Sequence, residues 1–550
     1  PLASRGIFVY TAAAPTVSVG ERITLSGNVA EFFDSTQITN PTGITLLASG
    51  ETLPEAVAFD TQTPSADPES PSCGINNFEC FEGMRVSIAD GFVTAPNQSF
   101  GGDPLAEAEI TASGERSLRE PGVEYPGLGG ICPQCAVWDG NPEMFEIDFD
   151  ALGLPNATVA GGTRFTATGV IGYEFGDYEI WPTAYELTEE PVLPVPAPGA
   201  GADQLSIASL NALDLFDPVQ DGPRPIPTCG AGYVANDRET PSQAEYDAKL
   251  DKVAGTVIEG LGLPDVIALQ EVESVDVLDD LAARIGTLSG GAVGYDAYLV
   301  FGNDRGNINN GYLVNPARVA VDDVEPIDAD ACLSSDNTPL HDRPSLQLEA
   351  RFVGGGADWP FVVINNHLRS LGGIDDEART RLKRHEQSQS VAARIQALQS
   401  GDPTLPVVVI GDLNAFQFSD GYVDVVGLLS GTSVEAANLV NIENAGVPGF
   451  DPGNQVDPVL HRPIESLPAG ERYSFMFRGV SQALDHALLS ASAEPFLVGF
   501  GYARGNADVY AGFAEDTGNV LRSSDHDGLV IVLDPAGRAD EVFSDRFESD

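Results

Sequence analysis

Short apolar runs alternate with helix-forming stretches in the second part of the chain. The apolar runs predict buried strands at residues 205–210, 266–270, 311–314, 361–365, 407–410, 487–489 and 529–533. Residues near 242–260, 274–286 and 376–398 have the helical periodicity of apolar positions that the buried face of a helix requires. Strands that alternate with helices in this way predict a large mixed α/β domain.

The first 190 residues instead show short strands and turns, without a stretch of helical periodicity. The sequence GERITLSG at residues 20–27 recurs as GTRFTATG at residues 162–169, and each copy continues into an aromatic strand. The repeat suggests small OB-like β-barrels, in tandem or interleaved, although common strand and turn residues can also coincide. A Pro/Gly/Ala tract, EEPVLPVPAPGAG, then predicts a semi-rigid linker. We therefore expect a β-rich region at 1–190, a linker at 191–202, an α/β domain at 203–536 and a tail at 537–550.

The formal net charge of -54 is the most unusual feature of the composition, and the chain has only three lysines. Such a surface repels nucleic acid at long range unless salt or metal ions screen it. A saline habitat would favour the same composition, because a shell of carboxylates stays hydrated. No apolar run approaches the roughly 20 residues that cross a bilayer, so we expect no membrane span. The start at Pro1, without a leader, indicates a processed or trimmed form.

The six cysteines lie in loop-like surroundings: Cys73, Cys80, Cys132, Cys135, Cys229 and Cys332. An even number of cysteines fits disulfides in an oxidising compartment. The alternative is one zinc site built from the first four, because Cys132 and Cys135 have the spacing of metal ligands, although Cys73 and Cys80 do not. The remaining two cysteines lie in two inserts of the α/β domain, and we predict that they pair with each other.

Polar residues stand abruptly at the ends of the predicted strands, where a rigid sheet can position catalytic groups. They are Asn211, Glu271, His367, Asp412, Asn414, Asp485, Asp525 and His526. A single polar residue at such a place is ordinarily a satisfied group that caps the strand. So many along one domain indicate a common cause.

These residues supply what the cleavage of a phosphodiester needs. The carboxylates suited to Mg²⁺ or Mn²⁺ are Glu271, Asp412 and Asp525. The neutral amides that can orient ligands or a phosphate are those of Asn211 and Asn414. The groups that can move protons near neutral pH are His367 and His526, with Asp485 as the expected partner of one of them.

Five short motifs surround these residues: QEV at 270–272, NHLRS at 366–370, GDLNA at 411–415, LDHALLS at 484–490 and SDHD at 524–527. Their order and spacing resemble the DNase I-like endonuclease/exonuclease/phosphatase superfamily. Within it the chain is most similar to the bacterial extracellular nucleases, in which a β-rich OB-like region precedes the catalytic domain. The resemblance covers residues 203 to about 535 well. Over the first 190 residues it is weaker and rests on GIFVYT and VGERITLSGNVAEFFDSTQIT.

The resemblance implies a four-layer α/β (α+β) sandwich and a metal site at one end of it. Glu271 would be the principal metal ligand, with Asn211 beside it, and Asp525 would complete the site. The implied cofactor is Mg²⁺ or Mn²⁺, with Ca²⁺ as a possible structural ion.

The resemblance also implies the roles of the remaining motif residues. Asp412 and Asn414 would orient the attacking water and the phosphate. His526, held by Asp485, would act as a base or as a phosphate-stabilising acid. His367 would protonate or steady the leaving group, and Arg343 in an Asp-Arg-Pro step would contact the phosphate.

Two positions depart from the pattern of the superfamily. Gly528 stands where Pro is usual, and we expect this change to be tolerated. The acidic residue that pairs with the first catalytic histidine falls at Asn310, so His367 is expected to lack a carboxylate partner.

Other charged residues have structural interpretations. We expect His486 to point away from the site, and His341, His385 and His461 to be surface or loop residues. The basic run at 379–385 and Arg369 could contact DNA phosphates, but a solvated helix face paired with neighbouring acids is the favoured interpretation. The acidic stretch at 146–150 matches no defined Ca²⁺ loop and is interpreted as solvated carboxylates.

The sequence thus predicts a secreted Mg²⁺- or Mn²⁺-dependent phosphodiesterase. The leading hypothesis is an extracellular nuclease that acts on DNA, or on RNA, with the β-rich region as a binding or anchoring module, and we expect it to be a monomer. The alternative is a phosphatase or phosphodiesterase of the same fold that acts on small or lipid phosphoesters. A catalytically silent matrix or adhesion protein is the third hypothesis, and the intact set of catalytic residues argues against it.

Overall fold

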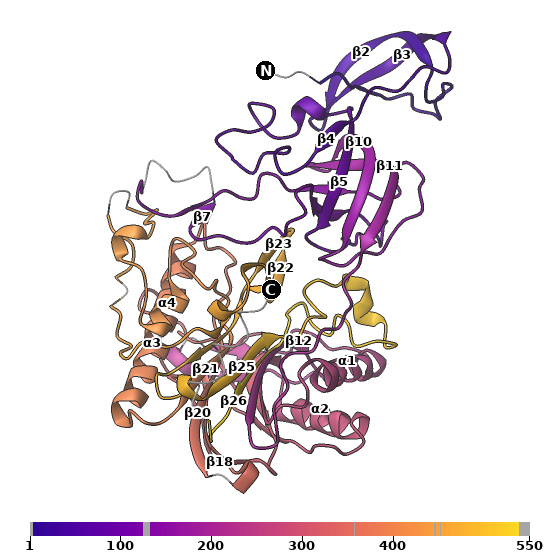
Figure 1. The fold of residues 1–550 in the computed structure, drawn as a ribbon. Coiled ribbons are helices and arrows are strands. Elements are labelled where there is room, and N and C mark those ends of the chain that lie inside the picture. Colours follow the sequence, from indigo (N-terminus) through magenta and orange to yellow (C-terminus); the bar gives the residue numbers. More distant parts are fainter. Residues whose placement is uncertain are drawn as a thin grey trace.

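The computed structural model describes residues 4–124, 132–230, 232–356, 358–444, 447–451 and 453–537. A β-rich N-terminal part lies beside a larger α/β part (Figure 1). The tail expected at 537–550 lies outside the described residues after Gly537. In the part of the chain that is described, no helix is both long and apolar enough to cross a membrane.

Two mixed sheets form the centre of the α/β part. The first has the order β16-β17-β15-β12-β26-β25. Its strands are β12 (Leu205–Leu215), β15 (Val266–Val272), β16 (Asp296–Leu299), β17 (Asn309–Val314), β25 (Leu497–Tyr502) and β26 (Leu529–Leu533). The second has the order β18-β19-β20-β21-β24. Its strands are β18 (Val319–Pro326), β19 (Leu346–Phe352), β20 (Trp359–His367), β21 (Val407–Asp412) and β24 (Asp485–Leu489).

Helices cover the outer face of each sheet. α1 (Gln243–Gly255) and α2 (Val275–Leu288) pack on the first sheet. α3 (Ala378–Gly401) and the short α4 (Val425–Ser430) pack on the second. A third apolar cluster, which includes Ile207, Phe361 and Ile531, fills the space between the sheets. The predicted four-layer sandwich is confirmed, because each sheet is buried on both faces.

The helix boundaries follow from local chemistry. α1 begins at a capping box, in which the Ser242 side chain accepts from the Glu245 amide and the Glu245 carboxylate accepts from the Ser242 amide. α2 begins at Ser274, whose side chain accepts from the Val277 amide. α4 ends at Gly431, which has a φ of 80° that favours glycine.

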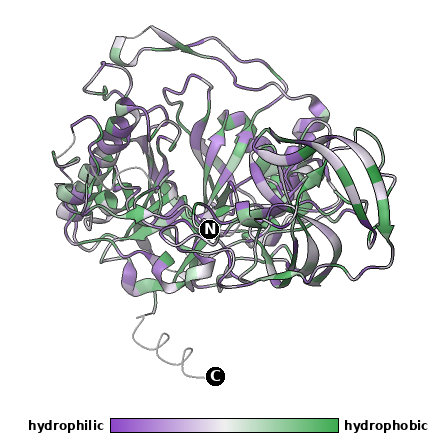
Figure 2. Cartoon of the chain, turned by 90° about the horizontal axis from the view of Figure 1, so that it is seen from above, coloured by the Kyte–Doolittle hydropathy of each residue, from purple (hydrophilic) through white to green (hydrophobic). Residues whose placement is uncertain are grey.

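The N-terminal part contains one closed barrel among the described residues. Its strands are β5 (Arg85–Val93), β6 (Ala108–Thr111), β9 (Phe145–Ile147), β10 (Arg164–Glu174) and β11 (Asp177–Glu189). They pair in the order β5-β6-β9-β11-β10, and β10 closes onto β5, while β4 (Val57–Phe59) pairs with β5 outside the ring. Buried and partly exposed residues alternate along β10, and hydrophobic and hydrophilic segments are interspersed over the whole chain (Figure 2). The β-rich region is confirmed, and its OB-like character stays a prediction with which a closed five-stranded barrel is consistent.

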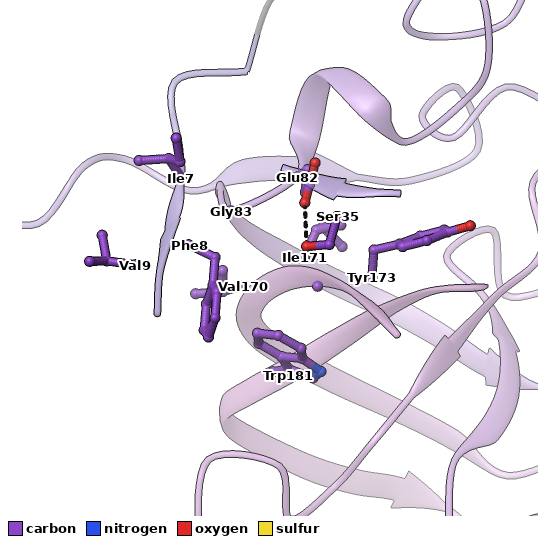
Figure 3. Close-up of a pocket in the computed structure, with 11 residues that line it drawn as sticks. Ile7, Phe8, Val9, Ser35, Glu82, Gly83, Val170, Ile171, Tyr173 and Trp181 are labelled. Atoms are coloured by element: carbon purple, nitrogen blue, oxygen red, sulfur yellow. Dashed lines mark hydrogen bonds between the residues drawn. The ribbon is translucent and has the colours of Figure 1, made fainter. Parts of the chain in front are cut away.

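The two copies of the predicted repeat occupy similar hairpins in different surroundings. The second copy begins β10 in the barrel. The first begins β2 (Arg22–Phe32), which pairs with β3 (Ser35–Ala48) in a separate three-stranded sheet that β1 (Phe8–Val9) completes. Phe8 of β1 lies against the Trp181 ring of the barrel, and Ser35 donates to Glu82 nearby (Figure 3). The first copy therefore forms a ribbon beside the barrel, not a second barrel.

Short two-stranded ladders complete the strand inventory. They are β7 (Val123–Glu124) with β8 (Val137–Trp138), β13 (Arg224–Ile226) with β14 (Tyr233–Ala235), and β22 (Phe475–Phe477) with β23 (Val480–Gln482).

The barrel is docked on the α/β part by buried polar contacts. Arg116 forms an ion pair with Asp508 at 2.7 Å and stacks on the Tyr473 ring. The backbones of Ser117 and Arg119 exchange hydrogen bonds with Ser481 of β23. The Pro-rich tract that was predicted as a linker also lies against the α/β part, where Val195 and Arg504 exchange two backbone hydrogen bonds.

All six cysteines form disulfides: Cys73–Cys80, Cys132–Cys135 and Cys229–Cys332. The zinc alternative is wrong, because its four proposed ligands are consumed in two of these bonds. The predicted pairing of Cys229 with Cys332 is confirmed.

We expect the double substitution Cys229→Ser and Cys332→Ser to lower the free energy of unfolding by about 2–4 kcal/mol. The bond closes a long loop, with a sequence separation of 103, and so restricts the unfolded chain strongly. Urea unfolding of both proteins measures the difference. As the control, the parent and the double variant are also unfolded in excess reductant, where their free energies of unfolding should be equal. A difference that persists in reductant would contradict a role for the bond.

Candidate active site

The sheet register brings three of the predicted side chains into one row. β20 and β21 are parallel, and His367 stands opposite Asp412. β21 and β24 are antiparallel, and Asp412 stands opposite Asp485. Gly411 permits this close approach, because it has a φ of 131° and a Cβ there would lie 2.2 Å from the Asn366 carbonyl oxygen.

His526 and Asp485 form a buried pair. The Nδ1 atom of His526 lies 2.7 Å from Oδ2 of Asp485. The Ser474 hydroxyl donates to the same carboxylate at 2.7 Å, and its oxygen accepts from the Asp485 amide. Because Nδ1 is engaged, Nε2 is the ring atom of His526 left for a reactant. Asp485 is thus the carboxylate partner of one histidine, as its position in the sequence predicted.

The opposite side of the row is a network of amides and carboxylates. The Asn211 amide donates to Asp412 at 3.1 Å and is 3.4 Å from Glu271. The backbone and side-chain amides of Asn414 donate to the two Asp412 oxygens at 2.7 and 3.1 Å. Glu271 and Asn414 have φ values of 58° and 47°, which are uncommon for residues with a side chain.

Burial and mutual repulsion set the protonation of these groups. Burial raises the pKa of Asp412 to about 7, although the positive charge of His526 opposes it. Burial and the charge of Asp214 raise the pKa of Glu271. Burial alone would lower the pKa of His526, but the charges of Asp485 and Asp412 outweigh it and raise that pKa well above its usual value. The site therefore holds more negative charge than its own side chains neutralise.

Such a site suits a hard divalent cation with oxygen ligands. The Oδ1 atom of Asp525 is buried and has no hydrogen-bond partner among the described residues. Glu271 lies close enough to Asp525 for the charge of Asp525 to raise the pKa of Glu271. Another group of possible ligand atoms in the site is formed by Asp412, Asp485 and His526, within 4.8 Å of one another. The donor set fits a metal ion, and the division between ligands and proton-transfer groups remains a proposal.

His367 and Arg343 lie at the rim of the network. The Nε2 atom of His367 lies 3.6 Å from both Glu271 and Asp412, and its Nδ1 atom is buried without a partner in the described structure. Asn310, which stands where the superfamily has the acidic partner of this histidine, donates to the Pro344 carbonyl and not to His367. Arg343 forms an ion pair with Asp304 at 3.0 Å and donates to the carbonyls of His367 and Leu368. These contacts place Arg343 as a support of the His367 strand end.

Several residues that support the site were missed from the sequence. Ser474 orients Asp485, and the Asp214 amide donates to Glu271 at 3.1 Å. Burial lowers the pKa of Lys249 to about 8 against the charges of Asp525, Asp214 and Glu271. Lys249 is one of only three lysines in the chain, and this rarity was the only feature of the sequence that could have drawn attention to it. The others act through contacts between distant segments, and no local motif marks them.

Two structural interpretations need correction. His341 and His385 are buried rather than at the surface, while His486 is buried and bonded to the Ala415 carbonyl as expected. The basic run on α3 is not a solvated face. Its partners are not the neighbouring acids but distant ones, in the pairs Arg379–Asp336, Arg381–Glu443, Lys383–Asp342 and Arg384–Asp420.

Comparisons with known proteins place the two parts of the chain. Residues 206–445 match the model of the endonuclease/exonuclease/phosphatase family, and residues 45–191 match a domain of unknown function. No curated protein matches the chain.

Solved structures with a similar fold include three of interest. The human Nocturnin catalytic domain is 14% identical over 62% of this chain and 95% of its own, with a TM-score of 0.36. An endonuclease/exonuclease/phosphatase from Bacteroides vulgatus is 14% identical over 60% and 98%, with a TM-score of 0.36. TDP2 from D. rerio, complexed with a single strand DNA product, is 16% identical over 60% and 98%, with a TM-score of 0.34.

Proposed function

We propose that this protein is an extracellular nuclease that hydrolyses DNA, because residues 206–445 match the model of the endonuclease/exonuclease/phosphatase family, whose members are metal-dependent phosphoester hydrolases. The observation that carries the chemistry is the buried row of His367, Asp412 and Asp485, with His526 bonded to Asp485. The row combines carboxylates for a cation with a histidine for proton transfer.

In the proposed mechanism, Glu271, Asn211 and Asp525 would hold a Mg²⁺ or Mn²⁺ ion, which would supply Lewis-acid stabilisation of the phosphate charge. Asp412 and Asn414, fixed by their mutual hydrogen bonds, orient the attacking water. Nε2 of His526 exchanges a proton with the reactants while Asp485 holds the ring. His367 steadies the leaving group, and Arg343 contributes positive charge beside it.

A cavity next to the site favours a polymeric substrate. Its volume is about 420 Å³, and its lining includes Arg305, Arg369 and Tyr233. Arg305 stacks on the Tyr233 ring, and Arg369 donates to Ser370 and Gly372. The two acidic residues of the lining, Asp336 and Asp342, pair with Arg379 and Lys383, which leaves the guanidinium groups of Arg305 and Arg369 for phosphates that flank the scissile bond. A small phosphoester has no flanking phosphates and would not need these additional contacts.

The proposed location outside the cell rests on the cysteines. Three disulfides join all six, and such bonds persist in oxidising compartments. The net charge of -54 makes the approach of DNA dependent on salt and divalent cations. Plasmid degradation with Mg²⁺ or Mn²⁺ across a range of salt concentrations, with a chelator control, tests the proposal. If the metal-loaded protein leaves DNA and RNA intact but cleaves bis-p-nitrophenyl phosphate, the substrate is a small or lipid phosphoester.

We expect the double variant Arg305→Ala and Arg369→Ala to lower kcat/KM for DNA by about tenfold or more, because two phosphate contacts are lost. Cleavage of bis-p-nitrophenyl phosphate should not change. Arg22→Ala, on the exposed ribbon, is the matched control. Equal losses on both substrates would assign these arginines to the fold or the chemistry and would remove the support for a polymeric substrate.

A further inference from the structure

Carboxylates crowd one face of three adjacent barrel strands. Glu109 of β6 stands opposite Glu146 of β9, and Glu146 stands beside Glu179 of β11. Side chains alternate along a strand, so the same face also carries Glu107, Asp148 and Asp177. The opposite face carries core residues such as Ile110, Ile147 and Ile180. Like charges directly opposite one another destabilise a sheet, so this face needs a compensating charge.

Three of these side chains converge on one point. Glu107 lies just before β6, Asp148 just after β9, and Glu179 within β11. One oxygen from each carboxylate lies within 4.8 Å of the other two. Two oxygens bound to one Ca²⁺ at about 2.4 Å can be separated by at most about 4.8 Å. The spacing is therefore that of ligands around a single calcium ion.

Glu179 provides an independent observation. Its exposed fraction is only 2%, and neither carboxylate oxygen has a hydrogen-bond partner of good geometry among the described residues, although the Trp181 side chain lies close enough to lower its pKa. Gly172 is the β10 residue that pairs with Glu179. The Trp181 ring packs against Gly172 so closely that a Cβ at this position would lie 2.3 Å from the ring. A buried carboxylate without any partner is costly, unless it is protonated or bound to a cation.

Among the described residues, the charged groups with the largest effect on Glu179 include no basic side chain. The charged groups that act on Glu179 are Glu107, Glu174 and Asp148, all acidic. Burial and these acidic neighbours, opposed by a hydrogen bond from the Trp181 side chain, together raise the pKa of Glu179 to about 8. Burial likewise raises the pKa of Glu146 to about 8 and that of Glu109 to about 7. The unfavourable burial of carboxylates therefore extends over the whole carboxylate face and is not confined to Glu179.

We propose that Glu107, Asp148 and Glu179 bind a structural calcium ion in the N-terminal barrel. The site takes a hard divalent cation through carboxylate oxygens, and the size of the cluster favours Ca²⁺ over the smaller Mg²⁺. The interpretation of Asp148 and its neighbours as solvated carboxylates is thereby replaced. The proposal does not depend on the proposed nuclease activity, because the site belongs to a different sheet.

The position of the carboxylate face suggests what the ion stabilises. Glu109 lies against Gly479, in the turn between β22 and β23 of the catalytic part. The same β22–β23 hairpin exchanges backbone hydrogen bonds with the segment that follows β6. By neutralising this face, calcium would hold the barrel in the conformation that docks onto the catalytic part.

Calorimetric titration of CaCl₂ into the chelator-treated full-length protein tests the site. We expect binding with a dissociation constant of about 10⁻⁴–10⁻³ M, as in extracellular calcium modules. Glu179→Gln should remove one binding site from the stoichiometry, and Asp148→Asn should do the same. Glu186→Gln, an exposed position on the same strand, is the matched control and should bind as the parent does.

Thermal unfolding provides the second readout. Calcium should raise the Tm of the parent by several degrees and leave that of Glu179→Gln unchanged. Without calcium, Glu179→Gln should be at least as stable as the parent, because a buried repulsion is removed; this separates loss of binding from loss of folding. Both variants should retain phosphodiesterase activity. Unchanged calcium stoichiometry in Glu179→Gln, or equal shifts of Tm in parent and variant, would overturn the site, and equal responses to MgCl₂ would overturn its assignment to calcium.

Discussion

We expect His526→Ala to lower kcat for metal-dependent DNA hydrolysis by about 10²–10⁴-fold, the range of a lost acid–base group. The Nδ1 atom of His526 is bonded to Asp485, and the pair is buried, so the ring is held with Nε2 as its atom for proton transfer. The loss should fall on kcat rather than on KM, because the proton is transferred in the transition state. Steady-state kinetics with plasmid and with bis-p-nitrophenyl phosphate measures it.

His461→Ala is the control for this experiment. His461 lies near Glu494 with one third of its side chain exposed, away from the row of catalytic residues. Its removal should leave kcat within about twofold of the parent, as for most surface substitutions. If His526→Ala retains more than a tenth of the parent kcat while folded, the proton-transfer role of His526 is wrong.

The second large effect is expected from Glu271→Gln, which should weaken the apparent affinity for Mg²⁺ or Mn²⁺ by at least about 100-fold and abolish activity at physiological metal concentrations. The substitution preserves the size of the side chain but removes one negative charge. Raising the metal concentration should restore part of the activity. Metal titrations of the hydrolysis rate, after treatment with EDTA, measure the shift.

Glu259→Gln serves as the matched control, because Glu259 is an exposed carboxylate of the same domain. Its metal dependence should equal that of the parent. A variant Glu271→Gln with normal metal dependence would show that the cation is held elsewhere, for which the compact group of Asp412, Asp485 and His526 is the evident candidate.

Much of the catalytic fold was predictable from the periodicity of the sequence. All seven strands and all three helices predicted in the α/β part are present; the bounds of β26 are as predicted, and those of the others are shifted by a few residues. Buried strands are continuous apolar runs and amphipathic helices repeat their apolar face, so both leave a local signal. The edge strands β16, β18 and β25 were missed, because they are only partly buried and their patterns are weaker. The interior strand β19 was also missed, because Gln347, Glu349 and Arg351 interrupt its apolar run although the strand is mostly buried.

Partners of the charged residues could not be predicted in the same way. Arg384 is 1% exposed and pairs with Asp420, on another segment, although its own helix carries acidic neighbours. His341 is fully buried and contacts Ser390 on α3, although it lies in an insert that resembles a surface loop. In each case, packing between segments distant in sequence determines the burial.

The acidic stretch at 146–150 is a further case in which contacts between distant segments determine the environment of charged residues. By sequence alone it is a run of alternating acids without a metal-binding motif. Only the register of β6, β9 and β11 reveals that its Asp148 meets Glu107 and Glu179, one of which is buried without a partner.

The sequence by itself determined the class of the catalytic domain, the candidate catalytic residues and the pairing of Cys229 with Cys332, because each depends on local pattern or on residue type at a strand end. The tertiary structure alone decided the rest: the single barrel, the partner of each charged side chain, the support of Asp485 by Ser474 and the carboxylate cluster of the barrel. These features depend on which strands become neighbours, and that choice is made by the burial of the whole apolar surface rather than by any segment alone.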